Sequence, residues 1–204
     1  MHAEGLQSLK DSLAAEADDK AKKTPALEER LFKARTILIY GGINQKLAEN
    51  VTARLLAMQA DGDAPITLFI NSQGGHVESG DTIYDMIKFV TPEVRIVGTG
   101  WVASAGSLIF SAAKPHNRYA LPNTRFLLHQ PSGGTGGTAS DIAIHAKEIV
   151  RMRQRLNEIY ARETGQPIER ITRDTERDYW MSAQEAIDYG LVGKIIENAS
   201  ELPA

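Results

Sequence analysis

Residues 94–107, VRIVGTGWVASAGS, contain the end of an apolar strand and the start of a helix. The β-branched run Val94–Val97 predicts a buried strand, and the small residues after Trp101 predict a tightly packed helix that begins near Ser104. A serine at such a junction lies beside main-chain amides that can stabilise developing negative charge. Ser104 is therefore a candidate nucleophile, although this stretch taken alone favours an ordinary helix-capping serine.

The segments on either side alternate between predicted strands and predicted helices. Upstream, we expect strands at Thr36–Tyr40 and Ile66–Ile70, each followed by a helix with apolar residues three or four positions apart. Those apolar residues are Leu47, Val51, Leu55 and Met58 in the first helix and Ile83, Met86, Ile87 and Val90 in the second. Downstream, short strands are expected around Arg118–Leu121 and Arg125–His129. This alternation is typical of a right-handed parallel α/β fold.

The C-terminal half begins with one long predicted helix, from Asp141 to about Arg162. Its apolar face comprises Ile142, Ile149, Met152, Leu156 and Ile159. Two shorter helices follow, one opened by Pro167 and one opened by a Ser182–Glu185 capping box and closed by Gly190. A last strand is expected at Leu191–Ile196.

The composition of the chain excludes several classes of protein. With 204 residues, 42% apolar and 24% charged, it predicts one globular domain after a charged N-terminal tail over residues 1–24. A net charge of -3 gives no basic field, so we expect no nucleic-acid partner. The lack of cysteine excludes disulfides, zinc–thiolate sites and a thiol nucleophile. We find no signal-peptide or membrane-span pattern, and we expect a soluble cytoplasmic protein.

Two histidines are candidates for a general base. His129 ends the apolar run of residues 127–131, LLHQP, where a half-buried structural histidine is the ordinary interpretation. His76 follows a glycine pair and is the rival. A carboxylate partner cannot be chosen from spacing, because several aspartates lie downstream. They are Asp141, Asp174, Asp178 and Asp188.

The glycine pair itself follows an apolar strand, in residues 69–76, FINSQGGH. Two glycines permit positive φ angles and close backbone approach, as an oxyanion hole or a peptide-binding edge requires. A phosphate-binding loop is the competing interpretation. It is disfavoured, because neither GxxxxGK[ST] nor GxGxxG spacing is present.

Taken together, these segments closely resemble the proteolytic subunits of the Clp protease family, which have a crotonase-like fold. The resemblance runs from about Leu31 to Ile196. It rests on the segments INSQGG at 70–75, ASAG at 103–106, LPNTR at 121–125, HQP at 129–131, DIAIHAKE at 141–148, RDTERD at 173–178 and AIDYGLV at 186–192.

The resemblance implies a serine endopeptidase that hydrolyses unfolded proteins to small peptides. It implies that Ser104 is the nucleophile, His129 the general base and Asp178 the orienting acid. It also implies that the backbone amides of Gly75 and Ala105 form the oxyanion hole. The resemblance implies no metal or other cofactor in this chain. ATP is expected to be used only by the partner ATPase.

The resemblance also implies a fold and an assembly. The implied fold is an α/β core of repeated βαβ units in a single domain, residues 25–204. This domain has a head at about 25–130 and 164–198 and a handle at about 131–163, with a protruding long helix. A strand in the Gly-rich Ser132–Thr138 is expected to precede that helix. In the assembly that the resemblance implies, heptameric rings stack into a tetradecamer, and a hexameric AAA+ ATPase of the Clp type docks in apolar pockets. The docking candidates are Leu55, Phe69, Phe89, Tyr119 and Ile196.

The chain departs from the usual pattern of this family at several positions. A charged stretch through Lys23 replaces the apolar axial loop, Gln73 replaces a proline, and Trp101 stands where a small or polar residue is usual. These departures indicate a divergent paralogue. Two alternatives stay open: a weakly active or structural ring subunit that needs a second paralogue, and a crotonase-type acyl-CoA hydratase or isomerase.

Overall fold

The computed structural model describes residues 26–134 and 136–203. The predicted tail over residues 1–24 lies outside the described residues. The chain divides into two units, residues 1–36 and residues 37–204. In the first unit, residues 26–33 are helical. The second unit contains the candidate site.

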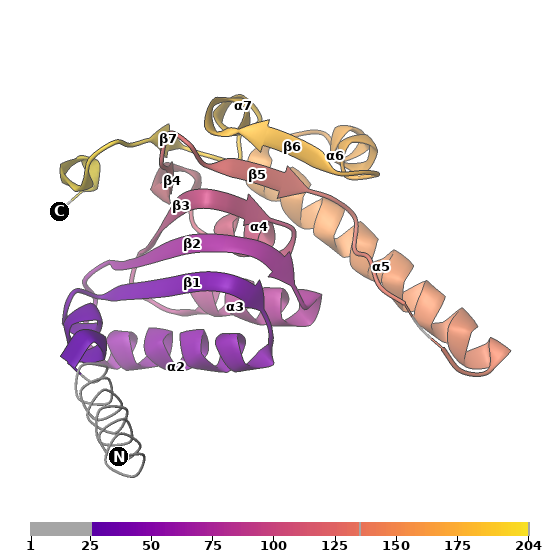
Figure 1. Ribbon diagram of the computed structural model, residues 1–204, viewed down its shortest axis with the longest axis horizontal. Coiled ribbons are helices and arrows are strands. Elements are labelled where there is room, and N and C mark those ends of the chain that lie inside the picture. The colour runs from indigo at the N-terminus through magenta and orange to yellow at the C-terminus, as the bar shows by residue number, and fades with distance from the viewer. Residues whose placement is uncertain (1–25, 135, 204) are drawn as a thin grey trace, which may run out of the picture. The chain divides into compact units, whose positions relative to one another are not determined.

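The centre of the fold is a seven-stranded sheet in which β1, β2, β3, β4 and β7 follow one another (Figure 1). The strands are β1 Thr36–Ile43, β2 Ile66–Gly75, β3 Val94–Ala103, β4 Arg118–Ala120, β5 Arg125–Leu128, β6 Tyr179–Ser182 and β7 Lys194–Ile195. The first half of β3 pairs in parallel with β4, and its second half pairs in parallel with β5. β5 in turn pairs with β6, antiparallel. The long β3 therefore joins the main sheet to the short β5–β6 ribbon.

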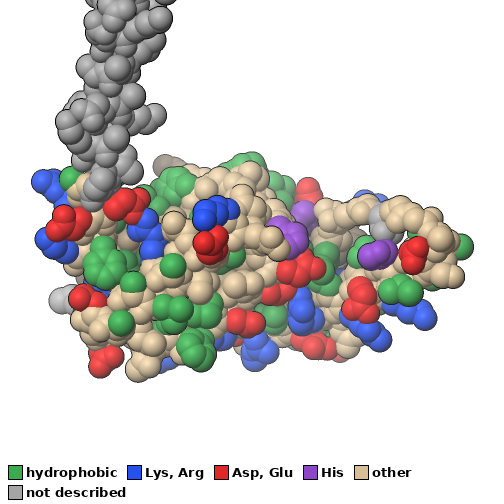
Figure 2. Space-filling model, turned by 90° about the horizontal axis from the view of Figure 1, so that it is seen from below, with side chains coloured by type: hydrophobic (Ala, Val, Ile, Leu, Met, Phe, Trp, Pro, Cys, Tyr) green, Lys and Arg blue, Asp and Glu red, His purple; other side chains and the backbone are tan. Residues whose placement is uncertain are grey.

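Helices cover one face of the sheet (Figure 1). These helices are α2 Gln45–Asp61, α3 Val77–Phe89 and α4 Ala105–Phe110. Three further helices follow in the C-terminal half: α5 Ala139–Thr164, α6 Ile168–Asp174 and α7 Ala183–Asp188. Short 3-10 turns lie at Pro115–Asn117 and Ala199–Glu201. Strand residues alternate accordingly: Ile37 and Ile39 are buried, whereas Leu38 and Tyr40 are exposed. Figure 2 shows the side of α2 and α3, where acidic and basic side chains are interspersed among hydrophobic ones.

The alternation of strand and helix predicted from the sequence is confirmed, with longer strands than expected at β1, β2 and β3. One prediction was wrong. The described residues of the segment 132–138 contain no strand. A strand needs a pairing partner, and a run of glycines loses much conformational entropy when it is ordered. Within the described residues, no helix is both long and apolar enough to cross a membrane.

The long helix α5 is buried only in its C-terminal part. Leu156 and Ile159 belong to the core, whereas Ile142 and Ile149 on the same helix face are exposed. Its first turn is fixed by a capping box between Thr138 and Asp141. Figure 1 shows the N-terminal part of α5 extending beyond the sheet.

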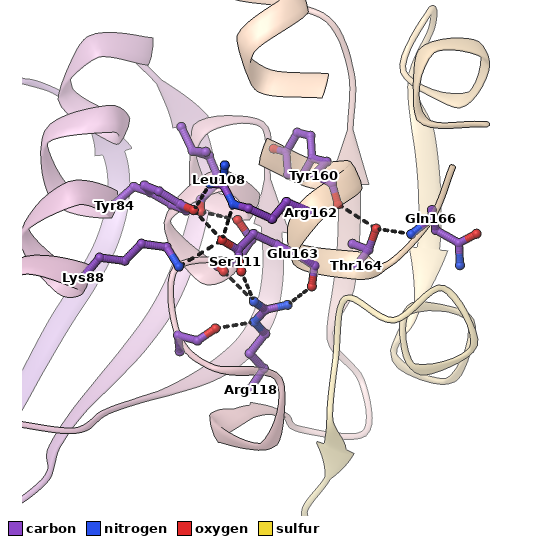
Figure 3. A network of polar contacts seen from close by, with 11 residues as sticks. Tyr84, Lys88, Leu108, Ser111, Arg118, Tyr160, Arg162, Glu163, Thr164 and Gln166 are labelled. Atoms are coloured by element: carbon purple, nitrogen blue, oxygen red, sulfur yellow. Dashed lines mark hydrogen bonds and ion pairs between the residues drawn. The ribbon is translucent and has the colours of Figure 1, made fainter. Parts of the chain in front are cut away.

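A buried ionic network holds the C-terminal end of α5 against the rest of the fold (Figure 3). The guanidinium of Arg118 is fully buried and donates to the carbonyls of Ser111, Ala113 and Glu163, and its Nη2 also lies 2.8 Å from Glu163 Oε2. The same carboxylate accepts from the Tyr84 hydroxyl at 2.6 Å and pairs with Lys88 at 2.9 Å. Glu163 thus connects α5 to α3 and to Arg118 at the start of β4.

Candidate active site

Ser104 occupies a strained turn between β3 and α4. Its φ is 56° and its ψ is -123°, a conformation that non-glycine residues rarely adopt and that costs about 1–3 kcal/mol. Its main-chain N–H donates to the carbonyl of Leu127 on β5 at 3.0 Å. Its side chain makes no capping hydrogen bond to α4. The ordinary interpretation of a helix-capping serine is therefore not what the structure shows.

His129 follows directly after β5, as Ser104 follows β3. Because Ala103 and Leu127 are partners in the parallel β3–β5 ladder, both residues lie beyond the carboxyl ends of adjacent strands. The His129 Nε2 lies 2.8 Å from Ser104 Oγ, within hydrogen-bond distance. The imidazole is 23% exposed, so it is partly shielded from water while still open to a substrate.

Asp178 reaches His129 through the antiparallel pairing of β5 and β6. Leu128 pairs with Tyr179, so the next pair beyond the ladder is His129 with Asp178. The His129 Nδ1 lies 3.0 Å from Asp178 Oδ1. The structure thus brings the three sequence-predicted side chains together in one hydrogen-bonded series.

The other candidate bases and acids have different partners. His76 precedes α3, and its ring contacts Ser79 Oγ at 2.8 Å and Glu78 at 3.2 Å. The three remaining aspartates are engaged in local contacts. Asp141 caps α5, Asp174 accepts from the Tyr189 hydroxyl, and Asp188 accepts from Gln184.

The glycine pair lies at the end of β2, with Gly74 packed closely against Ser104 and Gly75 against Ile43. A Cβ on Gly74, whose φ is +96°, would lie 2.5 Å from Ser104 Cβ, and a Cβ on Gly75, whose φ is +150°, would lie 2.3 Å from the Ile43 carbonyl oxygen. The buried Ser72 hydroxyl donates to the Gly41 carbonyl at 2.6 Å and accepts from the Gly74 N–H at 3.0 Å. No residue other than glycine fits either position without displacing its neighbours.

Sequence reasoning missed two supporting serines, Ser72 and Ser107. Ser107 is fully buried, with its hydroxyl 2.8 Å from the Val102 carbonyl and 2.7 Å from the Leu127 carbonyl. It therefore connects the ends of β3 and β5, the two strands that carry Ser104 and His129. The available signal was a serine one turn after the candidate nucleophile, which is too common to single out.

The structure gathers three of the five docking candidates. Tyr119 and Ile196 form a buried cluster with Val97, against which the partly buried Phe69 packs. Leu55 is fully buried in the core and offers no surface in this chain, whereas Phe89 is exposed at the end of α3.

Comparison with known proteins identifies the family. The model of the family described as Clp protease matches residues 19–199. The chain belongs to the Clp protease family. An ATP-dependent Clp protease proteolytic subunit 3 from Rhizobium etli is 57% identical over 190 residues, which cover 92% of this chain and 98% of the relative. A proteolytic subunit 2 from Gluconobacter oxydans is 58% identical, over 92% of this chain and 86% of the relative.

A comparison with solved structures supports the same family. ClpP1 from Listeria monocytogenes has a TM-score of 0.79 and 55% identity, and the match covers 87% of this chain and 99% of that one. The parallel sheet with its helices is therefore the ClpP fold. As a Clp protease subunit, the chain is a serine endopeptidase, and relatives numbered 2 and 3 agree with the predicted paralogue.

Proposed function

We propose that this chain is the proteolytic subunit of a compartmentalised ATP-dependent protease, with Ser104 as nucleophile, His129 as general base and Asp178 as the orienting carboxylate. The observation that carries the proposal is the pair of contacts at His129, 2.8 Å to Ser104 Oγ and 3.0 Å to Asp178 Oδ1. An ionised carboxylate only accepts hydrogen bonds, so the His129 Nδ1–H donates to Asp178 and the Nε2 lone pair faces the serine hydroxyl. This is the tautomer that a general base needs.

In the proposed reaction, His129 Nε2 takes the proton of Ser104 as Oγ attacks a peptide carbonyl. The imidazolium then gives that proton to the leaving amine, and an acyl-enzyme remains. A water molecule, deprotonated by the same imidazole, attacks the ester and releases the second product. Asp178 stabilises the imidazolium in both steps. The mechanism uses side chains and main-chain amides, without a metal or other cofactor.

The main-chain N–H groups of Gly75 and Ala105 are the proposed oxyanion donors. Supporting this, Ala105 follows Ser104 directly, and Gly74, the residue before Gly75, lies against Ser104. Each such donor contributes roughly a hundredfold to a thousandfold to kcat in serine peptidases.

The proposal includes self-association into heptameric rings that stack as a tetradecamer. The apolar face of α5 supports it: Leu156 and Ile159 are buried in this chain, but Ile142 and Ile149 are 44% and 37% exposed. An apolar face of this kind is covered most simply by another copy of the same helix.

A hexameric AAA+ ATPase of the Clp type is the proposed partner, and unfolded polypeptides are the proposed substrates. The relatives are named ATP-dependent, and the cluster formed by Phe69, Tyr119 and Ile196 provides apolar residues for docking. ATP is used by the partner alone, and a cytoplasmic location is part of the proposal.

Labelling with a serine-directed fluorophosphonate tests the assignment. The assembled chain should be labelled at Ser104 and should hydrolyse a fluorogenic peptide, and Ser104→Ala should abolish both. Ser132→Ala, at an exposed serine of the Gly-rich segment, is the control and should change neither. Labelling that appears only with a second paralogue would favour the weakly active ring subunit. Acyl-CoA turnover that survives Ser104→Ala would favour the crotonase-type enzyme.

A further inference from the structure

The carboxylate of Asp178 is the most exposed member of the proposed triad. Its side chain is 63% exposed, compared with 23% for His129. Side-chain packing therefore does little to hold it. The position of the carboxylate relative to the imidazole depends instead on the backbone of residues 175–178, which connects α6 to β6.

Gln130, the residue after the general base, binds this connection twice. Its main-chain N–H donates to the Thr175 carbonyl at 2.7 Å, and its side-chain amide donates to the Glu176 carbonyl at 2.8 Å. These bonds lie beyond the end of the β5–β6 ladder, on the far side of His129 and Asp178. The segments that carry the base and the acid are thus joined on both sides of the His129–Asp178 contact.

Thr175 attaches the same connection to the interior. It is fully buried, and its hydroxyl lies 3.0 Å from Asn157 Oδ1 on α5 and 2.8 Å from the Ile171 carbonyl on α6. Asn157 is itself buried, and its amide nitrogen lies 3.4 Å from Thr172 Oγ1. Buried polar contacts of this kind fix one geometry, because an unpaired amide or hydroxyl in the interior is costly.

We propose that Thr175, Asn157 and Gln130 are positioning residues that hold Asp178 against His129. They do so by fixing the backbone that carries the carboxylate, and they touch neither substrate nor the reacting atoms. The inference rests on the proposed role of Asp178 in the triad. It predicts that their effect on the reaction passes entirely through Asp178.

The first test replaces the Thr175 hydroxyl with a methyl group in the assembled, full-length chain. Thr175→Val should lower kcat for a fluorogenic peptide at least about tenfold with KM within about twofold, and Thr175→Ser should restore it. Thr124→Val is the matched control, because Thr124 is also buried and donates to a main-chain carbonyl, that of Gly98 at 2.9 Å. The control should leave kcat unchanged. An unchanged kcat in Thr175→Val would overturn the proposal.

The second test repeats the substitution in an Asp178→Ala background, with the rate of fluorophosphonate labelling as the readout. If Thr175 acts through Asp178, Thr175→Val should slow labelling at most about twofold in this background. A merely structural role predicts that Thr175→Val slows labelling equally in both backgrounds. An equal loss overturns the inference but leaves the triad standing. If Asp178→Ala itself does not slow labelling, both proposals fail. Gln130→Leu, which removes the bond to Glu176 nearer the surface, supplies the same comparison if Thr175→Val does not fold.

Discussion

Gly74 lies so close to Ser104 that a Cβ built on it would be 2.5 Å from the serine Cβ and 3.0 Å from the serine Oγ. The backbone of Gly74 also has a φ of +96°, which side chains disfavour. A methyl group at this position must therefore displace either Ser104 or the end of β2.

The substitution Gly74→Ala should consequently reduce kcat about a hundredfold or more, because both the serine and the backbone of the proposed oxyanion hole would move. Peptide hydrolysis and fluorophosphonate labelling measure the loss. Gly165→Ala is the control, since Gly165 also has a positive φ, +73°, but a Cβ there would meet no atom within 4 Å. Wild-type kcat in Gly74→Ala would contradict the close packing.

The hydroxyl of Ser107 is expected to matter for both stability and activity. Ser107→Ala leaves the Val102 and Leu127 carbonyls without this donor, which should cost about 1–3 kcal/mol of the free energy of unfolding. Since these carbonyls belong to the strands that carry Ser104 and His129, kcat should fall as well.

Ser111→Ala separates the two effects. Ser111 is equally buried, but its hydroxyl donates to the Leu108 carbonyl within the α4 region and joins no strands. Ser111→Ala should lower the free energy of unfolding, measured with urea, by a similar amount and leave kcat near the wild-type value. An equal loss of kcat in both variants would mean that Ser107 has no special part in aligning the strand ends.

The pKa of the Glu163 carboxyl predicts a dependence of stability on pH. Burial raises this pKa, but hydrogen bonds from Tyr84 and Lys88 and the charges of Lys88 and Arg118 outweigh it, so the pKa lies below its ordinary value of 4.5. As the pH falls, the Glu163 carboxyl of the unfolded chain is therefore protonated at a higher pH than that of the folded chain. The stabilisation by the charge is therefore complete above pH 4.5 and is lost as the pH falls through the lowered folded-state pKa.

Glu163→Gln should accordingly destabilise the fold by roughly 3–5 kcal/mol at pH 7, because it leaves the buried Arg118 guanidinium without its counter-charge. The difference from wild type should shrink as unfolding is measured at successively lower pH below 4.5. Glu148→Gln removes an exposed pair with Arg151 and should cost less than about 1 kcal/mol at any pH. A Glu163→Gln deficit that is constant with pH would contradict the assigned direction of the pKa.

Local sequence patterns predicted the strands of the core and the candidate nucleophile, but not the choice of acid. Ser104 could be found because an apolar run changes to small residues at one point in the chain. Asp178 could not, because the adjoining β6 is only four residues long and partly exposed, and the contact of Asp178 with His129 joins positions 49 residues apart. Apolar periodicity carries no information about such a contact. The resemblance to a family supplied it instead.

The wrong strand prediction at Ser132–Thr138 and the open face of α5 have a common physical basis. A glycine-rich segment can form a strand only against a partner, and an apolar helix face is covered only by another surface. Neither is supplied within the described part of this chain. Features that depend on a second copy are thus the ones that a single chain does not complete.

The exposed half of the α5 face gives the sharpest test of the proposed assembly. Ile149→Asp places a charge in the centre of that face, on a residue that contributes little to the core of its own chain, so the double ring should dissociate while the fold survives. Native mass measurement and the melting temperature report the two effects separately. Gln154→Asp introduces the same carboxylate at an exposed position on another side of α5 and should leave the assembly intact. A tetradecamer that persists in Ile149→Asp would mean that this face is not the surface through which the rings meet.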